Sequence, residues 1–169
     1  MKPKAFFYER PASLQEAGTL LNERELFAKA IAGSQSLGPM LNLRLAQPDL
    51  LVDITGIPEM TSVQSEREFV NIGACITHAN IEDGRIEDPS RGLLAKVAGG
   101  IAYRAVRNRG TIGGSLAHAD PAADWISVLL LLDAEILVHS PRGTRTIAAG
   151  DLMVSSFTTV LEADELIQS

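Results

Sequence analysis

The chain has 169 residues, of which 46% are hydrophobic, so it is long enough to bury a core as one domain or two closely packed subdomains. A formal net charge of -6 argues against nucleic acid as a ligand, because nucleic acid selects basic surfaces. No apolar run is long enough to span a bilayer, and the first residues lack the apolar segment of a secretory signal, so we expect a cytoplasmic protein.

The first 60 residues have the pattern of a small βαβ unit. Ser13 and Glu16 have the spacing of a capping box, which predicts a helix over residues 13–23. Short apolar segments at 28–32 and 50–54 predict two strands, and the residues around 37–45 between them predict a helix. These elements form the N-terminal part of the expected fold.

A glycine-containing loop, KAIAGSQSL at residues 29–37, connects the first of these strands to the helix. The free N–H groups and the dipole at a helix N-terminus favour phosphate as a ligand. An ordinary strand-to-helix turn with Ser36 as the N-cap also explains the same residues. The loop has neither the Gly-Lys-Ser/Thr of a P-loop nor the G-x-G-x-x-G spacing of a dinucleotide fingerprint.

From residue 61 onward the pattern is that of a larger part with mixed helices and strands. Residues 69–76 predict a strand, Thr77 predicts the cap of a short helix, and residues 93–102 predict a second helix. The apolar run 126–132 predicts a buried helix. Two alternating segments around SPRG, at 135–139 and 144–148, predict a hairpin.

The segment GTIGGSLAHADPAADW, residues 110–125, is dense in glycine and polar residues. Gly113 and Gly114 lack a Cβ, so we expect positive φ angles there, with amides close to an anion such as a diphosphate. Asp120 and Asp124 are able to accept hydrogen bonds from ribose or ring N–H groups. The alternative is a tight turn in which Asp120 caps the helix that follows.

Taken together, the two glycine segments resemble the FAD-binding medium subunit of molybdenum hydroxylases, a family that includes the flavoproteins of carbon monoxide dehydrogenase and bacterial xanthine dehydrogenase. The similarity lies in residues 32–60, 72–82 and 106–125. It implies an α+β, two-subdomain FAD-binding fold of the PCMH/vanillyl-alcohol-oxidase-like type, divided into residues 1–60 and 61–169. The family continues into a further C-terminal domain that this chain lacks, and residues 157–167 resemble the segment leading into it.

The resemblance also implies which residues hold FAD. Backbone amides of the first loop would wrap the diphosphate, and Ser34 stands where the family usually has a second glycine, so it must take a conformation that a side chain tolerates. The expected cofactor-binding residues are Ala30, Ile31, Ala32, Gly33, Ser34, Gln35, Ser36, Leu37, Ile101, Thr111, Gly113, Gly114, Ser115, Asp120 and Asp124. No side chain is expected to act as a general acid or base. Metal ligands are not expected either, because His118, Asp120 and Asp124 lack a fourth ligand.

The family resemblance implies an oxidoreductase subunit of a multi-subunit FAD- and molybdopterin-dependent dehydrogenase. Cys75 is the single cysteine, and one thiolate cannot hold an iron-sulfur cluster. The implied partners are therefore an iron-sulfur small subunit and a molybdenum-pterin large subunit, with electrons passing through FAD to NAD, oxygen or another acceptor. Two alternatives stay open: a non-catalytic docking module and a self-contained flavin oxidoreductase.

A few other residues have expectations of their own. Cys75 is expected to pack as a small apolar residue, Trp125 as a core or interface aromatic, and His78 to lie on the surface or at a helix cap. Arg107 and Arg109 would either neutralise the diphosphate or pair with surface acids.

Overall fold

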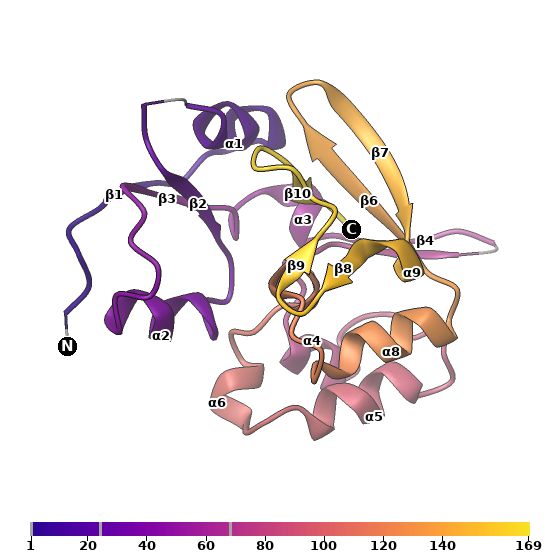
Figure 1. Ribbon diagram of the computed structural model, residues 1–169. Coiled ribbons are helices and arrows are strands. Elements are labelled where there is room, and N and C mark those ends of the chain that lie inside the picture. Colours follow the sequence, from indigo (N-terminus) through magenta and orange to yellow (C-terminus); the bar gives the residue numbers. More distant parts are fainter. Residues whose placement is uncertain (1, 24, 68) are drawn as a thin grey trace.

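The computed structural model describes residues 2–23, 25–67 and 69–169. The fold contains two three-stranded sheets, one parallel with the order β1-β3-β2 and one antiparallel with the order β10-β6-β7 (Figure 1). Two short antiparallel pairs, β4-β5 and β8-β9, complete the strands of the described residues. The expected α+β fold class is confirmed.

The parallel sheet is built from the N-terminal residues. Its elements are β1 (Phe7–Glu9), α1 (Leu14–Leu21), β2 (Ala28–Ile31), α2 (Leu37–Asn42) and β3 (Leu50–Asp53). Both β1 and β2 run parallel to β3, with Phe7 and Ala28 each opposite Leu50. The predicted βαβ unit is therefore present, in the predicted order and close to the predicted bounds.

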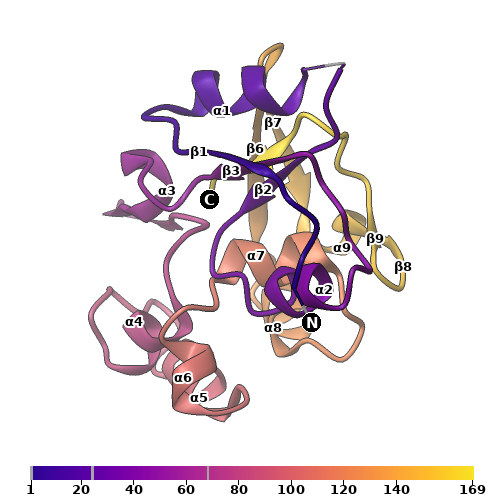
Figure 2. The same cartoon turned by 90° about the vertical axis from the view of Figure 1, so that its left-hand side faces the viewer.

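Helices cover both faces of this sheet, because successive strand residues point to opposite faces. Leu50 and Val52 belong to the main core, to which α1 contributes Leu14. Leu51 points the other way and packs against Leu41 of α2. Figures 1 and 2 accordingly show α1 and α2 on opposite sides of the strands. The carboxyl end of β2 is left free to lead into the first glycine loop.

The rest of the chain forms the second part of the fold. Its elements are α3 (Pro58–Thr61), β4 (Val63–Ser65), β5 (Val70–Ile72), α4 (His78–Glu82), α5 (Leu93–Gly100), α6 (Arg104–Arg107), α7 (Ile112–His118), α8 (Asp124–Leu131), β6 (Glu135–Ser140), β7 (Gly143–Ala148), α9 (Ala149–Leu152), β8 (Met153–Ser155), β9 (Thr158–Thr159) and β10 (Leu166–Ile167). The expected hairpin is β6-β7, with Ser140 opposite Gly143. The Oγ of Thr77 accepts from the amide of Asn80 and caps α4 as predicted.

The C-terminal segment completes the antiparallel sheet. Leu166 of β10 lies opposite His139 of β6, and the amide of Ala74 donates to the carbonyl of Gln168 at 2.9 Å. Residues 157–167, which resemble the segment leading into a further domain, are thus packed into this domain.

The predicted strand over residues 69–76 is too long, since β5 ends at Ile72. Beyond it the backbone amides alternate between two segments. Gly73 and Cys75 donate to the carbonyls of Ser62 and Met60 at 2.9 and 2.8 Å, and Ala74 between them donates to the Gln168 carbonyl at 2.9 Å. Gly73 also lies so close to Met60 that a Cβ there would be 2.4 Å from the Met60 carbonyl oxygen. Tertiary contacts, not a neighbouring strand, satisfy this stretch of backbone.

Helix predictions after residue 92 need three corrections. The helix predicted over 93–102 ends at Gly100, and a separate turn, α6, follows at Arg104–Arg107. The helix after Asp120 begins only at Asp124, because the Asp120 carboxylate accepts from the Ala122 amide at 2.9 Å and closes a turn first. The apolar run 126–132 is only partly buried, since Leu131 is 73% exposed.

A continuous core joins the two parts of the chain. Buried residues from α1 and β3 belong to the same cluster as Trp125 of α8 and Val138 of β6. Met60, which is fully buried, lies in α3 at the predicted subdomain boundary. The division after residue 60 therefore remains a prediction, and the position of each part depends on packing against the other.

Candidate functional site

The candidate site is a cavity of about 410 Å³ between the two glycine segments. The end of β2 and the loop 32–36 line one side, and residues 110–118 with the C-terminal residues 165–167 line the other. Its volume lies in the range of sites for small molecules and cofactors.

Free backbone amides distinguish the first glycine loop. Within the described residues, the N–H groups of 33–37 have no hydrogen-bond partner. Ser34 has φ of 58°, in the left-handed region, so it takes the conformation that favours glycine instead of one that side chains prefer. The Gln35 side chain donates to the Gly33 carbonyl at 2.7 Å and braces the loop. Ser36 occupies the N-cap position of α2 without a capping bond from its hydroxyl. Successive N–H groups around a left-handed residue form a typical anion-binding concavity.

The second glycine segment differs from the expected loop, because residues 112–118 form the helix α7. Gly113 and Gly114 are not among the positive-φ residues, so the expectation of left-handed backbone there is wrong. Their amides are also engaged: Gly113 donates to the Ala74 carbonyl at 2.9 Å and Gly114 to the Thr111 hydroxyl at 3.1 Å. Gly113 is required for close packing instead, since a Cβ would lie 2.4 Å from that of Ala74.

The cavity brings together all but two of the expected cofactor-binding residues. Those that line it are Ala30, Ala32, Gly33, Ser34, Gln35, Ser36, Leu37, Ile101, Thr111, Gly113, Gly114, Ser115 and Asp120. Ile31 packs instead against the small core under α2. Asp124 is exposed at the start of α8 and is not among the lining residues.

Several lining residues were not expected from the sequence. The main ones are Met60, Cys75, His78, Gly110 and Glu165. Residues 74–78 lie between a strand and the first turn of a capped helix and within the segment 72–82 that resembles the family, and these are the signals that pointed to them. The C-terminal residues have no local signal, since they reach the cavity only through the pairing of β10 with β6.

Cys75 is buried, and it donates a long hydrogen bond from Sγ to the Ile54 carbonyl at 3.7 Å. Burial raises the pKa of its thiol to about 12. The thiol is therefore protonated at neutral pH and unreactive, as expected for a small packing residue.

His78 was expected on the surface or at a helix cap; it is the first residue of α4, next to the cap Thr77, and it is buried. It is 5% exposed, and its Nδ1 accepts from the Trp125 indole N–H at 3.1 Å. Burial lowers its pKa to about 4, the nearby Arg107 charge adds to this shift, and Asp124 opposes it. Trp125 is fully buried, which confirms its expected core position.

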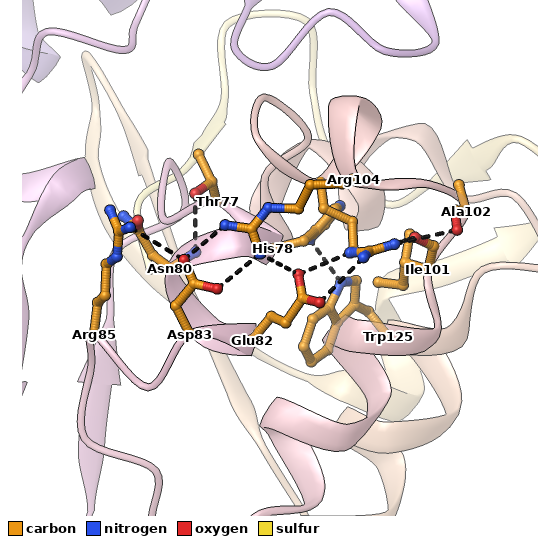
Figure 3. A network of polar contacts seen from close by, with 11 residues as sticks. Thr77, His78, Asn80, Glu82, Asp83, Arg85, Ile101, Ala102, Arg104 and Trp125 are labelled. Carbon is orange, nitrogen blue, oxygen red and sulfur yellow. Dashed lines mark hydrogen bonds and ion pairs between the residues drawn. The ribbon is translucent and has the colours of Figure 1, made fainter.

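Of the two arginines, Arg107 pairs with an acid rather than facing the cavity. Its guanidinium binds Glu82 at 2.8 Å and donates to the carbonyls of Ile101 and Ala102. Arg104 joins the same network through Glu82 and Asp83 (Figure 3). Among the described residues Arg109 has no ion pair. The network fixes the backbone of residues 101–102, which we call the lip of the cavity because Ile101 lines it.

The part of the chain that the structure describes contains no group of three or more His, Cys, Asp or Glu side chains arranged to bind a metal ion. None of its helices has both the length and the apolar character needed to cross a membrane.

Comparison with known proteins assigns the class of this domain. Residues 4–169 match the sequence model of the family described as the FAD binding domain in molybdopterin dehydrogenase. The chain therefore belongs to this family.

Individual relatives and structures agree with this assignment. The chain is 42% identical over 167 residues to the nicotine 6-hydroxylase medium subunit of Paenarthrobacter nicotinovorans, covering 99% of this chain and 59% of that protein. It is 38% identical to the carbon monoxide dehydrogenase medium chain of Hydrogenophaga pseudoflava, covering 99% and 58%. The crystal structure of quinoline 2-oxidoreductase from Pseudomonas putida 86 superposes with a TM-score of 0.91 at 39% identity, covering 99% of this chain and 59% of the other. The chain thus spans less than two thirds of the length of these relatives.

Proposed function

We propose that this chain binds FAD as part of the medium subunit of a molybdenum hydroxylase complex. The observation that carries the proposal is the row of free amides at residues 33–37, which faces a cavity of cofactor size in a domain of an FAD-binding family. When bound, FAD supplies the redox chemistry, taking electrons from iron-sulfur clusters on a partner subunit and passing them to an external acceptor.

The residues of this chain have binding and orienting roles. Amides of the first loop hold the diphosphate, because charge-assisted N–H bonds to phosphate need no compensating side-chain charge. Helix α7, fixed by the contact of Gly113 with Ala74, forms the opposite wall. Leu166 and Ile167 add apolar side chains to the lining of the cavity.

The proposed partners are an iron-sulfur small subunit and a molybdenum-pterin large subunit. The names of the relatives support this, since two are a medium subunit and a medium chain of larger enzymes. A single buried cysteine in this chain is consistent with clusters held elsewhere. Turnover would require those partners, so the isolated chain is expected to bind cofactor without acting on a substrate of the complex.

The test is the visible absorption spectrum of the purified chain after incubation with FAD and removal of free cofactor. We expect a retained two-band flavin spectrum. We also expect ADP to displace the flavin and adenosine to displace it far less, because only ADP carries the diphosphate for the first loop. A colourless chain would contradict the proposal and favour a docking module. Equal competition by ADP and adenosine would show that residues 33–37 do not bind the diphosphate.

A further inference from the structure

His78 carries a hydrogen-bonding group that the proposed function leaves unassigned. It is the first residue of α4, and its backbone N–H donates to the Gly110 carbonyl at 2.9 Å. The residue is 5% exposed and is one of the residues that line the cavity. A buried imidazole is thus held against the second glycine segment with one side in the core and the other at the cavity.

Trp125 determines which ring nitrogen of His78 carries the proton. Its indole Nε1–H lies 3.1 Å from Nδ1 of His78, and the two rings are 5.8 Å apart between centroids (Figure 3). An indole N–H only donates, so Nδ1 is the acceptor and carries no proton. The lowered pKa, about 4, keeps the ring neutral at neutral pH. The single ring proton is therefore on Nε2.

The Nε2 edge of the ring has no partner within the described residues. It faces Gly110, where a Cβ would come within 2.9 Å of Nε2 and 2.8 Å of Cδ2. The absence of a side chain at residue 110 therefore keeps this edge accessible. Nε2 is not among the fully buried polar side-chain atoms that lack a partner in the described residues, so it borders accessible space and is free to donate to an acceptor there.

We propose that His78 is a cofactor-binding residue whose Nε2–H donates a hydrogen bond to an acceptor atom of FAD, and that Trp125 is the positioning residue that fixes this tautomer. The inference rests on the proposed function, because it needs FAD in this cavity. A neutral donor orients the cofactor without adding positive charge beside it. The proposal adds His78 to a set of expected cofactor ligands that otherwise consists of the two glycine segments and Ile101.

Two substitutions separate a ligand role from a merely structural one. In His78→Asn the side-chain amide reaches about the position of Nδ1, so it still accepts from Trp125 but no longer donates into the cavity. In His78→Gln the amide reaches about the position of Nε2, so a donor toward the cavity is retained. We expect His78→Asn to weaken FAD binding about 5- to 10-fold, the effect of one neutral hydrogen bond. His78→Gln should stay within about 3-fold of the native chain. A purely structural role predicts the reverse order and would overturn the inference.

Nitrogen NMR of the histidine-labelled native chain gives a second readout that does not depend on the variants folding. The spectrum should show His78 with Nδ1 unprotonated and Nε2 protonated, and saturation with FAD should shift the Nε2 signal. His139, on β6 and outside the lining of the cavity, is the internal control and should not shift. An Nδ1–H tautomer, or an Nε2 signal unchanged by bound FAD, would overturn the proposal. A native chain that retains no FAD would overturn the proposed function itself, and the tautomer in the free chain distinguishes the two failures.

Discussion

Gly33 lies so close to the backbone of Arg109 that a Cβ on residue 33 would be 2.0 Å from the Arg109 carbonyl oxygen. The first glycine loop and the residue just before the second glycine segment are therefore in direct backbone contact. Residues 76 positions apart in the sequence meet at one edge of the cavity. No side chain fits between them, which explains glycine at position 33 without any positive φ.

Replacing Gly33 by alanine should push the two segments apart. We expect Gly33→Ala to lower the free energy of unfolding by about 1–3 kcal/mol, the usual cost of overpacking, and to abolish retention of FAD. Gly100→Ala is the matched control, because a Cβ on Gly100 meets nothing within 4 Å. Gly100 lies in α5, so alanine there should stabilise by about 0.5–1 kcal/mol. Chemical denaturation and the flavin spectrum measure both effects; a Gly33→Ala chain as stable as the native one would contradict the contact.

Ser34 holds a left-handed backbone at φ of 58° that glycine adopts more readily. Ser34→Gly should therefore be more stable than Ser34→Ala by about 1 kcal/mol, the cost of a Cβ in this region. Both variants lack the hydroxyl, so their difference isolates the backbone conformation. The measurement is urea unfolding of the two variants, and equal midpoints would show that position 34 is not strained.

The buried His78 makes stability depend on pH. Its folded pKa is about 4 against an ordinary value of 6.5, so as the pH falls the unfolded chain takes up a proton before the folded chain does. The contribution of the neutral His78 ring to the free energy of unfolding is complete above pH 6.5 and is lost as the pH falls from 6.5 to about 4. Its full size is at most about 3 kcal/mol, from the shift in pKa.

The matching measurement is the free energy of unfolding of the native chain and of His78→Gln over this pH window. The native chain should lose stability between pH 6.5 and 4, whereas the variant, which has no ring to protonate, should give a flatter profile. His139→Gln serves as the control for the loss of a histidine elsewhere. Parallel profiles for the native chain and His78→Gln would show that His78 is not held neutral.

Arg107 connects the end of α4 to the cavity lip. Its side chain is 12% exposed and donates to the Glu82 carboxylate and to the carbonyls of Ile101 and Ala102. Ala102, with φ of 41°, has a backbone conformation that needs such support. Lysine cannot form this set of bonds, so Arg107→Lys should cost about 1–3 kcal/mol of unfolding free energy.

The control for Arg107 is Arg85→Lys. Arg85 belongs to the same acidic network, pairing with Asp83 at 3.2 Å, but its side chain is 67% exposed (Figure 3). Lysine there should change stability by less than about 0.5 kcal/mol. Equal effects at the two positions, measured by thermal and urea unfolding, would show that the bonds to Ile101 and Ala102 do not hold the lip.

The amino-acid sequence by itself determined the features that depend on neighbouring residues. The capping of α1 by Ser13 and of α4 by Thr77 follows from short polar side chains placed before apolar periodic runs. The β6-β7 hairpin follows from two alternating segments around Pro141 and Gly143, the latter at φ of 131°. The family resemblance likewise predicted that the two glycine segments share one site, and most of the residues it named line one cavity.

Only the tertiary structure decided whether each glycine is needed for a positive φ angle or for close packing. Gly113 allows close packing against Ala74, and Gly33 allows contact with the Arg109 backbone, whereas the left-handed residue of the site is Ser34. The residue types of a short segment do not show whether its glycine serves a positive φ angle or a close packing contact, because both depend on the absence of a Cβ. The neighbour that makes the difference is remote in sequence in both cases.

The same reason explains the residues that were misplaced or missed. His78 is buried because Trp125, 47 residues away, packs over it. β5 stops at Ile72 because the next amides, those of residues 73–75, donate in turn to the carbonyls of Ser62, Gln168 and Met60. Glu165 reaches the cavity only when β10 pairs with β6. A local sequence pattern indicates which secondary structure a segment prefers. Burial and unmet hydrogen-bonding groups depend on which distant segments pack against it, and those contacts exist only in the folded chain.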